Sequence, residues 1–330
     1  MNAAKVDAND YVNFLVATPL SYSCVEAARV QPEPDRAAHD AFTRLLHRLE
    51  PDATALWEEA AGQVNKQTGV LILDDTTLDK PYAKQMALVT RHWSGKHHRV
   101  VRGINLLTLL WSDGERHIPC DYRLYDKEQD GLSKNDHFKA LLHCAHARGF
   151  TPECVLFDSW YSSLENLKVV RDLGWRWLTR LKANRLANPD HKRLRPLSEC
   201  DIRPSGTSVW LKGYGLILVF KIVAPDGDIA YWATNDLHMP ELERLRLTEN
   251  AWAIENYHRG IKQFCGVERG QLRHARAQRN HIGLALRAFL RLEAYCYVKG
   301  ISWYQAKLNI VRDAVRAYLA HPLYSLSPTA

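Results

Sequence analysis

The chain has 330 residues, of which 46% are hydrophobic and 25% are charged, and its net charge is +7. These values are ordinary for a globular protein of one or two domains, and no apolar run reaches the roughly 18 residues that a membrane span needs. The N-terminal residues lack the basic and apolar segments of a secretory signal. Seven scattered cysteines without a CxxC pair argue against a zinc ribbon or a disulfide framework and favour the reducing cytoplasm.

The positive charge is unevenly distributed. Residues 1–65 carry five Lys/Arg against ten Asp/Glu, a balance of −5, so the other 265 residues carry +12. Arginines recur at 269, 273, 276, 279, 287 and 291, with His274 and His281 among them. This arginine stripe is typical of a protein that binds a polyanion. Nucleic acid is favoured over a membrane surface because no basic, Trp/Leu-rich amphipathic helix accompanies it. A basic surface helix without a partner is the alternative.

Helical signals dominate the first 65 residues, where Phe42, Leu45, Leu46 and Leu49 recur at helical spacing and Pro51 ends the run. The pattern then changes to short apolar runs typical of buried strands. These runs are 70–73, two strands joined at the turn 112–114, and 155–157.

Helices are predicted between these strands, one from Ser133 to Gly149 and one that Gly174 closes, and "RWLTRLKA" returns as a strand. Three strands followed by helix, strand, helix and strand predict an α/β domain with a mixed sheet. Residues 183–236 contain three strand-like runs and an Asp226-Gly227 turn, which predict a β-rich insertion. Only helices are predicted after about Pro240.

Acidic residues follow two of the predicted strands. Asp74 and Asp75 come after "VLIL", Asp158 comes after "VLF", and Glu255 lies on the first helix after the insertion. Side chains at strand ends project from a rigid frame into accessible space. Clustered carboxylates repel one another unless they bind divalent cations, and two cations about 4 Å apart can promote attack on a phosphodiester. If each residue is considered alone, a simpler interpretation than metal binding is that Asp75 is a turn residue and that Asp158 caps a helix.

The helix predicted after Asn250 places Glu255, Arg259 and Lys262 at i, i+4 and i+7, and therefore on one face. A solvated ion pair is the simplest interpretation of these three residues. Trp252 and Ile254 belong to the apolar residues that would face a core.

Three segments, "LILDDTTLDKP", "CVLFDSWYSS" and "IENYHRGIKQ", resemble the signature blocks of DDE transposases of the insertion-sequence-four group. The blocks occur in order, with 83 residues from Asp75 to Asp158 and 97 more to Glu255, and the resemblance covers about residues 70 to 300. It implies an RNase H-like core with a β-strand insertion. It also implies that Asp75, Asp158 and Glu255 are the catalytic residues and metal ligands.

The resemblance also implies contacts with DNA. Lys262 matches a family lysine, seven residues after the glutamate, that holds a DNA phosphate. Ala251 and Thr248 stand where the family often has an arginine and a tyrosine, so Tyr257 or Arg259 is expected to replace them. Further predicted DNA-binding residues are Lys80, Arg273, Arg276 and Arg279. Trp210 and Trp232 of the insertion are candidates to stack on a flipped base, and a position in the core is the alternative for each of them.

The function implied is cut-and-paste movement of an insertion sequence. Two Mg²⁺ ions, for which Mn²⁺ can substitute, would support cleavage of the element ends through a hairpin and strand transfer into target DNA. The partners would be double-stranded DNA of the terminal inverted repeats and of the target, bound by a homodimer in the synaptic complex. The enzyme would act in the bacterial cytoplasm, at the nucleoid.

The predicted domains are an N-terminal helical, DNA-end-binding domain (1–66) and an RNase H-like core in two parts (67–182 and 237–300). The β-rich insertion (183–236) separates these two parts, and a C-terminal helix and tail (301–330) follow. Two alternatives remain open. One is an RNase H-like nuclease or resolvase without strand transfer, and the other is a domesticated DNA-binding protein that has lost catalysis.

Overall fold

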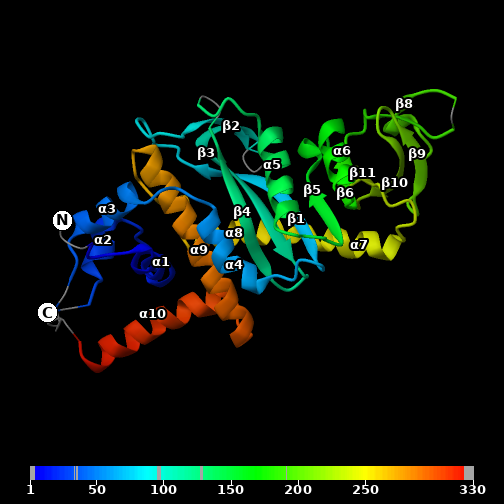
Figure 1. Ribbon diagram of the computed structural model, residues 1–330. Coiled ribbons are helices and arrows are strands. Elements are labelled where there is room, and N and C mark those ends of the chain that lie inside the picture. The colour runs from blue at the N-terminus through cyan, green and yellow to red at the C-terminus, as the bar shows by residue number, and fades with distance from the viewer. Residues whose placement is uncertain are drawn as a thin grey trace, which may run out of the picture. The chain divides into compact units, whose positions relative to one another are not determined.

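The computed structural model describes residues 4–32, 34, 36–94, 98–126, 129–190 and 192–322, and the predicted tail at 323–330 lies outside them. The chain forms two compact units, drawn as ribbons in Figure 1. Unit 1 comprises residues 1–52, 84–87 and 259–330, and unit 2 comprises residues 53–83 and 88–258. The N-terminal and C-terminal helices therefore share one unit, while the strands belong to the other.

Unit 1 is built on a long helix with a buried face. Its helices are α1 (Ala8–Ala17), α2 (Cys24–Arg29), α3 (His39–Arg48), the end of α8 (Trp252–Phe264), α9 (Ala275–Lys299) and α10 (Trp303–Ala320). Helices α1, α3 and α10 pack against α9. His281 lies in the core of this unit, where its Nδ1 is 3.0 Å from the Tyr11 hydroxyl and its Nε2 is 3.1 Å from the Gly266 carbonyl oxygen. His281 is thus a buried residue and adds no surface charge to the arginine stripe, which corrects its place in that prediction.

Unit 2 is organised around one sheet of the described strands. They are β1 (Val70–Asp79), β2 (Thr90–Ser94), β3 (Arg99–Ser112), β4 (His117–Tyr125), β5 (Cys154–Phe157), β6 (Trp177–Leu181), β7 (Leu186–Asn188), β8 (Arg195–Pro196), β9 (Thr207–Leu211), β10 (Gly215–Val223) and β11 (Ile229–Thr234). Their order is β2-β3-β1-β5-β6-β11-β10-β9-β7-β8, and β4 pairs with β3. The central pairs β1–β5 and β5–β6 are parallel, whereas the β3 pairs and β6–β11 are antiparallel. The predicted mixed sheet is confirmed.

Helices cover this sheet. Unit 2 holds α4 (Thr54–Ala60), α5 (Lys134–Ala147), α6 (Leu164–Asp172), α7 (Glu241–Asn250), the start of α8, and the short 3-10 helices η1 (Ala61–Gln63), η2 (Ser159–Tyr161) and η3 (Leu197–Glu199). Figure 1 shows α5 and α6 next to each other alongside β5, and the two helices are in contact. Ser133 caps α5 through a capping box, and Gly149 beyond its end adopts a positive φ of 82°, as the sequence predicts.

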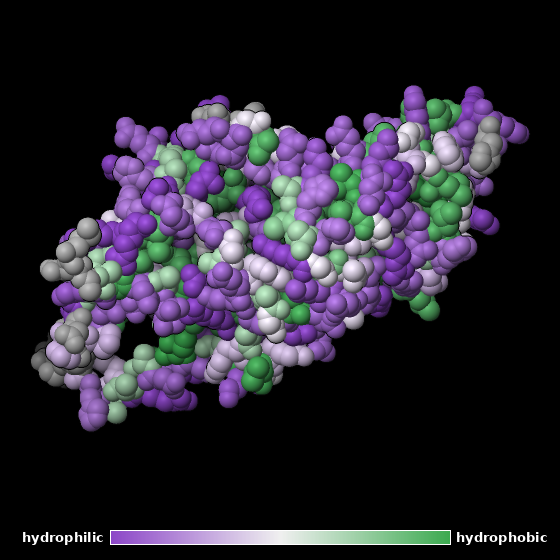
Figure 2. Space-filling model, in the orientation of Figure 1, coloured by the Kyte–Doolittle hydropathy of each residue, from purple (hydrophilic) through white to green (hydrophobic). Residues whose placement is uncertain are grey.

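The predicted β-rich insertion extends the central sheet. Strand β11 pairs with β6 through Trp232 and Arg180, and β10, β9 and β7 follow outward. Gly227 has a φ of 92° in the turn between β10 and β11, which fits the hairpin predicted there. Trp210 and Leu216 form an exposed cross-strand pair, 48% and 40% accessible, and Figure 2 shows hydrophobic residues on the visible face near β8 and β9.

Among the described helices, none combines the length and the apolar character that crossing a bilayer would require.

Candidate active site

Alternate residues of three neighbouring strands share one face of the sheet. The parallel register of β1 and β5 pairs Ile72 with Leu156. Because side chains alternate along a strand, Asp74, two residues after Ile72, projects on the same face as Asp158, two residues after Leu156. Arg180 of β6 also lies on this face, and all five side chains line one pocket. The pleat and the register therefore bring Asp74 and Asp158 to neighbouring positions.

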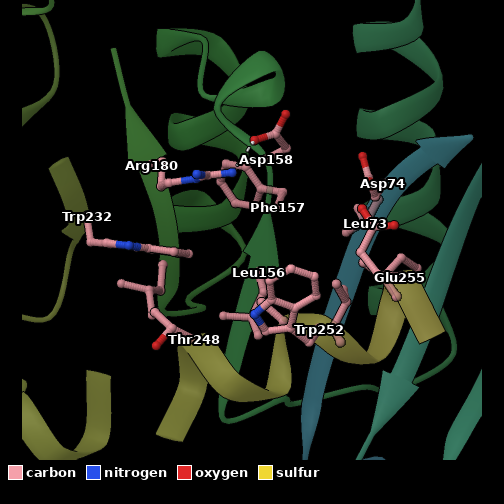
Figure 3. A pocket seen from close by; sticks show the side chains of 14 residues that line it. Leu73, Asp74, Leu156, Phe157, Asp158, Arg180, Trp232, Thr248, Trp252 and Glu255 are labelled. Atoms are coloured by element: carbon pink, nitrogen blue, oxygen red, sulfur yellow. Dashed lines mark ion pairs between the residues drawn. The ribbon is translucent and has the colours of Figure 1, made fainter. Parts of the chain in front are cut away.

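Helix α8 supplies the third carboxylate. Glu255 lies in its first turn and lines the same pocket as Asp74. Carboxylate oxygens of Asp74 and Glu255 and a ring nitrogen of His258 all lie within 4.8 Å of one another. Figure 3 shows Asp74 on its strand and Glu255 on its helix on the same side of the pocket. Two carboxylates and an imidazole this close together form a donor set for a divalent cation.

Asp158 is held in place by two contacts. Its Oδ1 accepts a hydrogen bond of 2.6 Å from the Ser159 backbone N–H, which caps η2. The same oxygen lies 3.6 Å from Nη2 of Arg180, a pair drawn as a dashed line in Figure 3. Asp158 thus acts as the predicted helix cap, and its second oxygen, Oδ2, is not used by either of these contacts.

Asp75 faces the other side of the sheet. Its Oδ2 accepts hydrogen bonds from Lys134 Nζ at 2.7 Å and from Asn105 Nδ2 at 2.5 Å, and its Oδ1 accepts one from the Tyr161 hydroxyl. Lys134 lies in the first turn of α5, and its ammonium group also stands 5.3 Å from the centroid of the Trp160 ring. Asp75 is therefore part of an ion pair between sheet and helix and is not in the cluster formed by Asp74 and Glu255.

The two adjacent aspartates have opposite electrostatic environments. Burial raises the pKa of Asp74 well above its ordinary value, and the negative charges of Asp75, Asp158 and Glu255 raise it further. Burial also acts to raise the pKa of Asp75, but Lys134, Asn105 and Tyr161 together hold that pKa below its ordinary value. Ionisation of Asp74 is therefore opposed by burial and by the neighbouring carboxylates, and a bound cation would relieve this repulsion.

The pocket beside the carboxylates has aromatic walls. A volume of about 290 Å³ is open to water-sized molecules. Trp232 of β11 and Trp252 of α8 line it, with Thr248 at the end of α7 (Figure 3). Arg180 stacks over the Trp232 ring with its guanidinium carbon 5.7 Å from the ring centroid. An acidic edge, an arginine and two indole rings thus surround one cavity in unit 2.

The other residues predicted to bind DNA lie at several places. Tyr257 is fully buried and Lys80 is 7% exposed, so neither offers a surface contact. Arg259 is exposed at the start of the unit 1 part of α8. Lys262, also in unit 1, pairs with Glu268 at 3.7 Å.

Within the arginine stripe, Arg273 is exposed, and Arg276 pairs with Glu50 at 2.7 Å, with both partners in unit 1. Arg279 is half-buried. Trp210 lies on the exposed face of the sheet described above.

Several residues of the site were missed by sequence reasoning. His258 follows Glu255 by three positions, a spacing that places both on one helix face, so this signal was available. The partners of Asp75 and the pairing of Arg180 with Asp158 depend on tertiary contacts. They leave no local pattern in the sequence.

The comparison with protein families identifies the superfamily of the chain. Residues 2–199, more than half of the chain, match the family described as DDE superfamily endonuclease. The chain therefore belongs to the DDE superfamily endonucleases, as its three sequence blocks predict. The matched residues include Asp74, Asp75 and Asp158 but end before Glu255. No curated protein matches the chain.

Solved structures support the fold. A cryo-EM structure of the piggyBac transposase synaptic complex with hairpin DNA matches with a TM-score of 0.53 and 13% identity, covering 98% of this chain and 74% of that one. A Drosophila P element transposase strand transfer complex matches with a TM-score of 0.28 and 12% identity, covering 53% of this chain and 37% of that one. At these identities the first likeness shows a shared fold, and the second carries no further argument.

Proposed function

We propose that this chain is a DDE transposase that cleaves the ends of a mobile DNA element and joins them to target DNA. The observation that carries the proposal is the convergence of Asp74, Asp158 and Glu255 on one pocket from two parallel strands and one helix. Family membership supports cleavage of a phosphodiester, and the fold shared with a transposase supports the joining step.

The carboxylates would hold divalent cations, Mg²⁺ with Mn²⁺ as a substitute. Asp74 and Glu255 are the nearest pair, and Asp158 would complete the set by giving up its contact with Arg180. Two bound cations would supply an activated water or 3′-hydroxyl and stabilise the leaving oxygen. Arg180, once released, is free to approach a phosphate of the DNA strand in the same pocket.

We assign the first catalytic carboxylate to Asp74 and not to its neighbour Asp75. Sequence resemblance favours Asp75, whereas the pleat directs Asp75 toward Lys134 and away from Glu255. The ion pair with Lys134 keeps Asp75 ionised and uses its carboxylate. Asp75 therefore acts as a positioning residue on the face of the sheet opposite the site. Its contacts fix both the strand β1 and the start of the helix α5.

The aromatic pocket would receive an unstacked base near the cut. Trp232 and Trp252 offer ring faces, and stacking on such a face is worth about 1–3 kcal/mol per base. Trp232 is therefore favoured over Trp210, which lies outside the pocket. Replacing Trp232 by Ala should lower cleavage and alter the fluorescence of a 2-aminopurine placed at the element end, because the unstacked base loses the ring that quenches it. Trp210→Ala should preserve both signals, and the reverse pattern would exclude this assignment.

Double-stranded DNA, both element ends and target, would be held by the exposed arginines of the stripe together with Arg259 and Lys262. A homodimer would bring two ends together, acting in the bacterial cytoplasm at the nucleoid. Analytical ultracentrifugation with and without end DNA tests the dimer, because a protein that remains monomeric on paired ends contradicts it.

The direct test is cleavage of a supercoiled plasmid that carries both DNA flanks of the gene, with Mg²⁺ or Mn²⁺. Wild-type protein should give nicked, then excised and joined products. Asp74→Asn, Asp158→Asn and Glu255→Gln should each lower the rate by more than about a hundredfold, because each removes a metal ligand. Asp172→Asn, an exposed aspartate on α6, is the matched control.

The outcomes separate the alternatives. Nicking without joining would indicate a nuclease or resolvase, and DNA binding without cleavage would indicate a domesticated DNA-binding protein. Wild-type activity in all three carboxylate variants would refute the proposed site.

A further inference from the structure

We propose that His258 is a ligand of the metal centre, and that its nitrogen makes the centre bind Mn²⁺ in preference to Mg²⁺. The inference rests on the proposed function and refines it, because the family resemblance assigns oxygen ligands only. It concerns the unit 2 cluster of Asp74, Glu255 and His258.

The geometry places the imidazole against the two carboxylates. One ring nitrogen of His258 lies within 4.8 Å of a carboxylate oxygen of Asp74 and of Glu255. The His258 side chain is only 5% exposed, whereas Glu255 is exposed and Asp74 half-buried. The histidine thus closes the inner side of the cluster, and the acidic residues lie toward the pocket.

The spacing along α8 provides a second argument. Glu255 and His258 form a Glu-x-x-His sequence, and residues three apart lie on the same helix face. This sequence delivers a carboxylate and an imidazole to one metal ion in the carboxylate-bridged metal centres of helical bundles. Asp74 comes from a rigid central strand, so the three donors are fixed by two elements of unit 2.

The mixed donor set determines which ion binds best. Mg²⁺ requires near-ideal octahedral oxygen coordination and loses its waters reluctantly. Imidazole nitrogen suits transition ions, and carboxylates suit both Mg²⁺ and Mn²⁺. Two carboxylates and one imidazole, with water in the remaining positions, form a mixed set that suits Mn²⁺, whereas Mg²⁺ would gain little from the nitrogen. His258 therefore raises affinity for Mn²⁺ more than affinity for Mg²⁺.

The other buried histidines of the described chain, His92, His137 and His281, have different surroundings. The Nε2 of His92 on β2 lies 2.7 Å from the Thr90 hydroxyl. His281 in unit 1 lies between a tyrosine hydroxyl and a backbone carbonyl. His137 on α5 is influenced by the carboxylates of Asp130 and Asp136, and its Nε2 lies 3.4 Å from Asp130 Oδ2. Among the described residues, His258 is distinguished by a three-donor group, in which its ring nitrogen and one oxygen each of Asp74 and Glu255 all lie within 4.8 Å of one another.

The test is pulsed electron paramagnetic resonance of the full chain with one equivalent of Mn²⁺. Directly bound imidazole should give ¹⁴N echo modulation, which [¹⁵N]histidine labelling should replace by a ¹⁵N signal. His258→Gln should remove the modulation and raise the Kd for Mn²⁺ by roughly tenfold, with a smaller change for Mg²⁺. His137→Gln, a buried histidine of the same unit, should leave the signal and both Kd values unchanged.

Two results overturn the inference. Bound Mn²⁺ without ¹⁴N modulation in the wild-type protein, or unchanged modulation in His258→Gln, would show that the histidine is not a ligand. The labelling experiment needs no substitution, so it remains decisive if the variant misfolds. The proposed function fails separately, if Asp74→Asn and Glu255→Gln bind Mn²⁺ as tightly as the wild type and cleave DNA equally well.

Discussion

Two adjacent aspartates of β1 have different roles because neighbouring positions of a strand face opposite sides of the sheet. Asp74 and Asp75 have the same side chain, but the strand directs them to opposite faces of the sheet. Asp75 meets an ammonium, an amide and a hydroxyl, whereas Asp74 meets other carboxylates. The contacts of Asp75 stabilise the fold. Asp74 destabilises it, and we attribute its presence to cation binding.

We expect opposite changes in stability when each aspartate is neutralised. Asp74→Asn should raise the unfolding free energy of the metal-free protein by about 1 kcal/mol, because it removes repulsion among partly buried carboxylates, and should raise Tm by about 2–4 °C. Asp75→Asn should lower the unfolding free energy by about 3 kcal/mol, because it leaves the Lys134 ammonium without its anionic partner.

Differential scanning calorimetry of both variants without divalent metal measures these changes. Added Mn²⁺ should stabilise the wild type and Asp75→Asn, but not Asp74→Asn, because only the last loses a ligand. Equal destabilisation by the two substitutions would contradict the assignment of their roles.

At the scale of elements, two arginines hold α7, the helix that precedes α8 of the site. Arg176, just before β6, contacts Asp236 at 2.8 Å and Glu243 of α7 at 2.9 Å. Arg246, also on α7, pairs with Glu153 at 2.8 Å. These ion pairs, which we call the α7 clamp, hold α7 at the end of the sheet. Helix α8 begins two residues after α7, so the clamp also positions the helix that carries Glu255.

The α7 clamp should make the free energy of unfolding depend on pH in the acidic range. Burial alone would raise the pKa of Asp236, but Arg176 and the His238 backbone N–H hold it below its ordinary value. A lowered folded-state pKa gives stability that is present above the unfolded pKa, about 4, and lost as the pH falls through the folded pKa.

Asp236→Asn should therefore cost about 2 kcal/mol at pH 7, the usual value of a charge-assisted hydrogen bond, and this cost should disappear as the pH falls below 4. Urea unfolding of both proteins from pH 2.5 to 7 measures the difference. Asp172→Asn, which breaks an exposed pair, is the control and should follow the wild type throughout. A difference that is constant with pH would contradict this role of Asp236.

The same elements show which parts of the fold could be predicted from the sequence. The caps of α5, the hairpin turns at 112–114 and 226–227, and the short strand before Asp158 follow from local patterns and are found in the structure. The apolar run Val70–Leu73 predicted a strand that ends before the aspartates. Instead β1 continues to Asp79 because β3 pairs along its whole length, from Val70 opposite Ser112 to Asp79 opposite Gly103.

This extension changes the interpretation of the site. Polar residues inside a strand look like a loop in the sequence, since their partners come from a distant segment. The sequence places both Asp74 and Asp75 after the strand, whereas in the structure both lie within β1 and the pleat directs them to opposite faces. The contribution of Lys134 was equally hidden, because it depends on a contact across 59 residues.

At the scale of the whole molecule, the uneven charge predicts how DNA affinity responds to salt. The exposed arginines of the stripe lie in unit 1, where Arg276 is paired with Glu50. Arg273→Ala should weaken binding of any duplex by a similar factor and lower the slope of log K against log [salt] by about 1, because one phosphate contact is lost. Glu50→Gln should tighten binding, because it releases Arg276.

Fluorescence anisotropy with an unrelated duplex and with the flanks of the gene, between 50 and 300 mM salt, measures both effects. Lys192→Ala, which removes a cation of unit 2 outside the stripe, is the control. Identical slopes for wild type and Arg273→Ala would exclude this arginine from the DNA surface.

The measurement that tests the central claim most directly is the anomalous scattering of Mn²⁺ in crystals of the protein with duplex DNA. We expect at least one ion about 2 Å from carboxylate oxygens of both Asp74 and Glu255, with Asp158 turned from Arg180 toward the same centre. An ion held by Asp75, or Mn²⁺ bound only away from Asp74 and Glu255, would contradict the account.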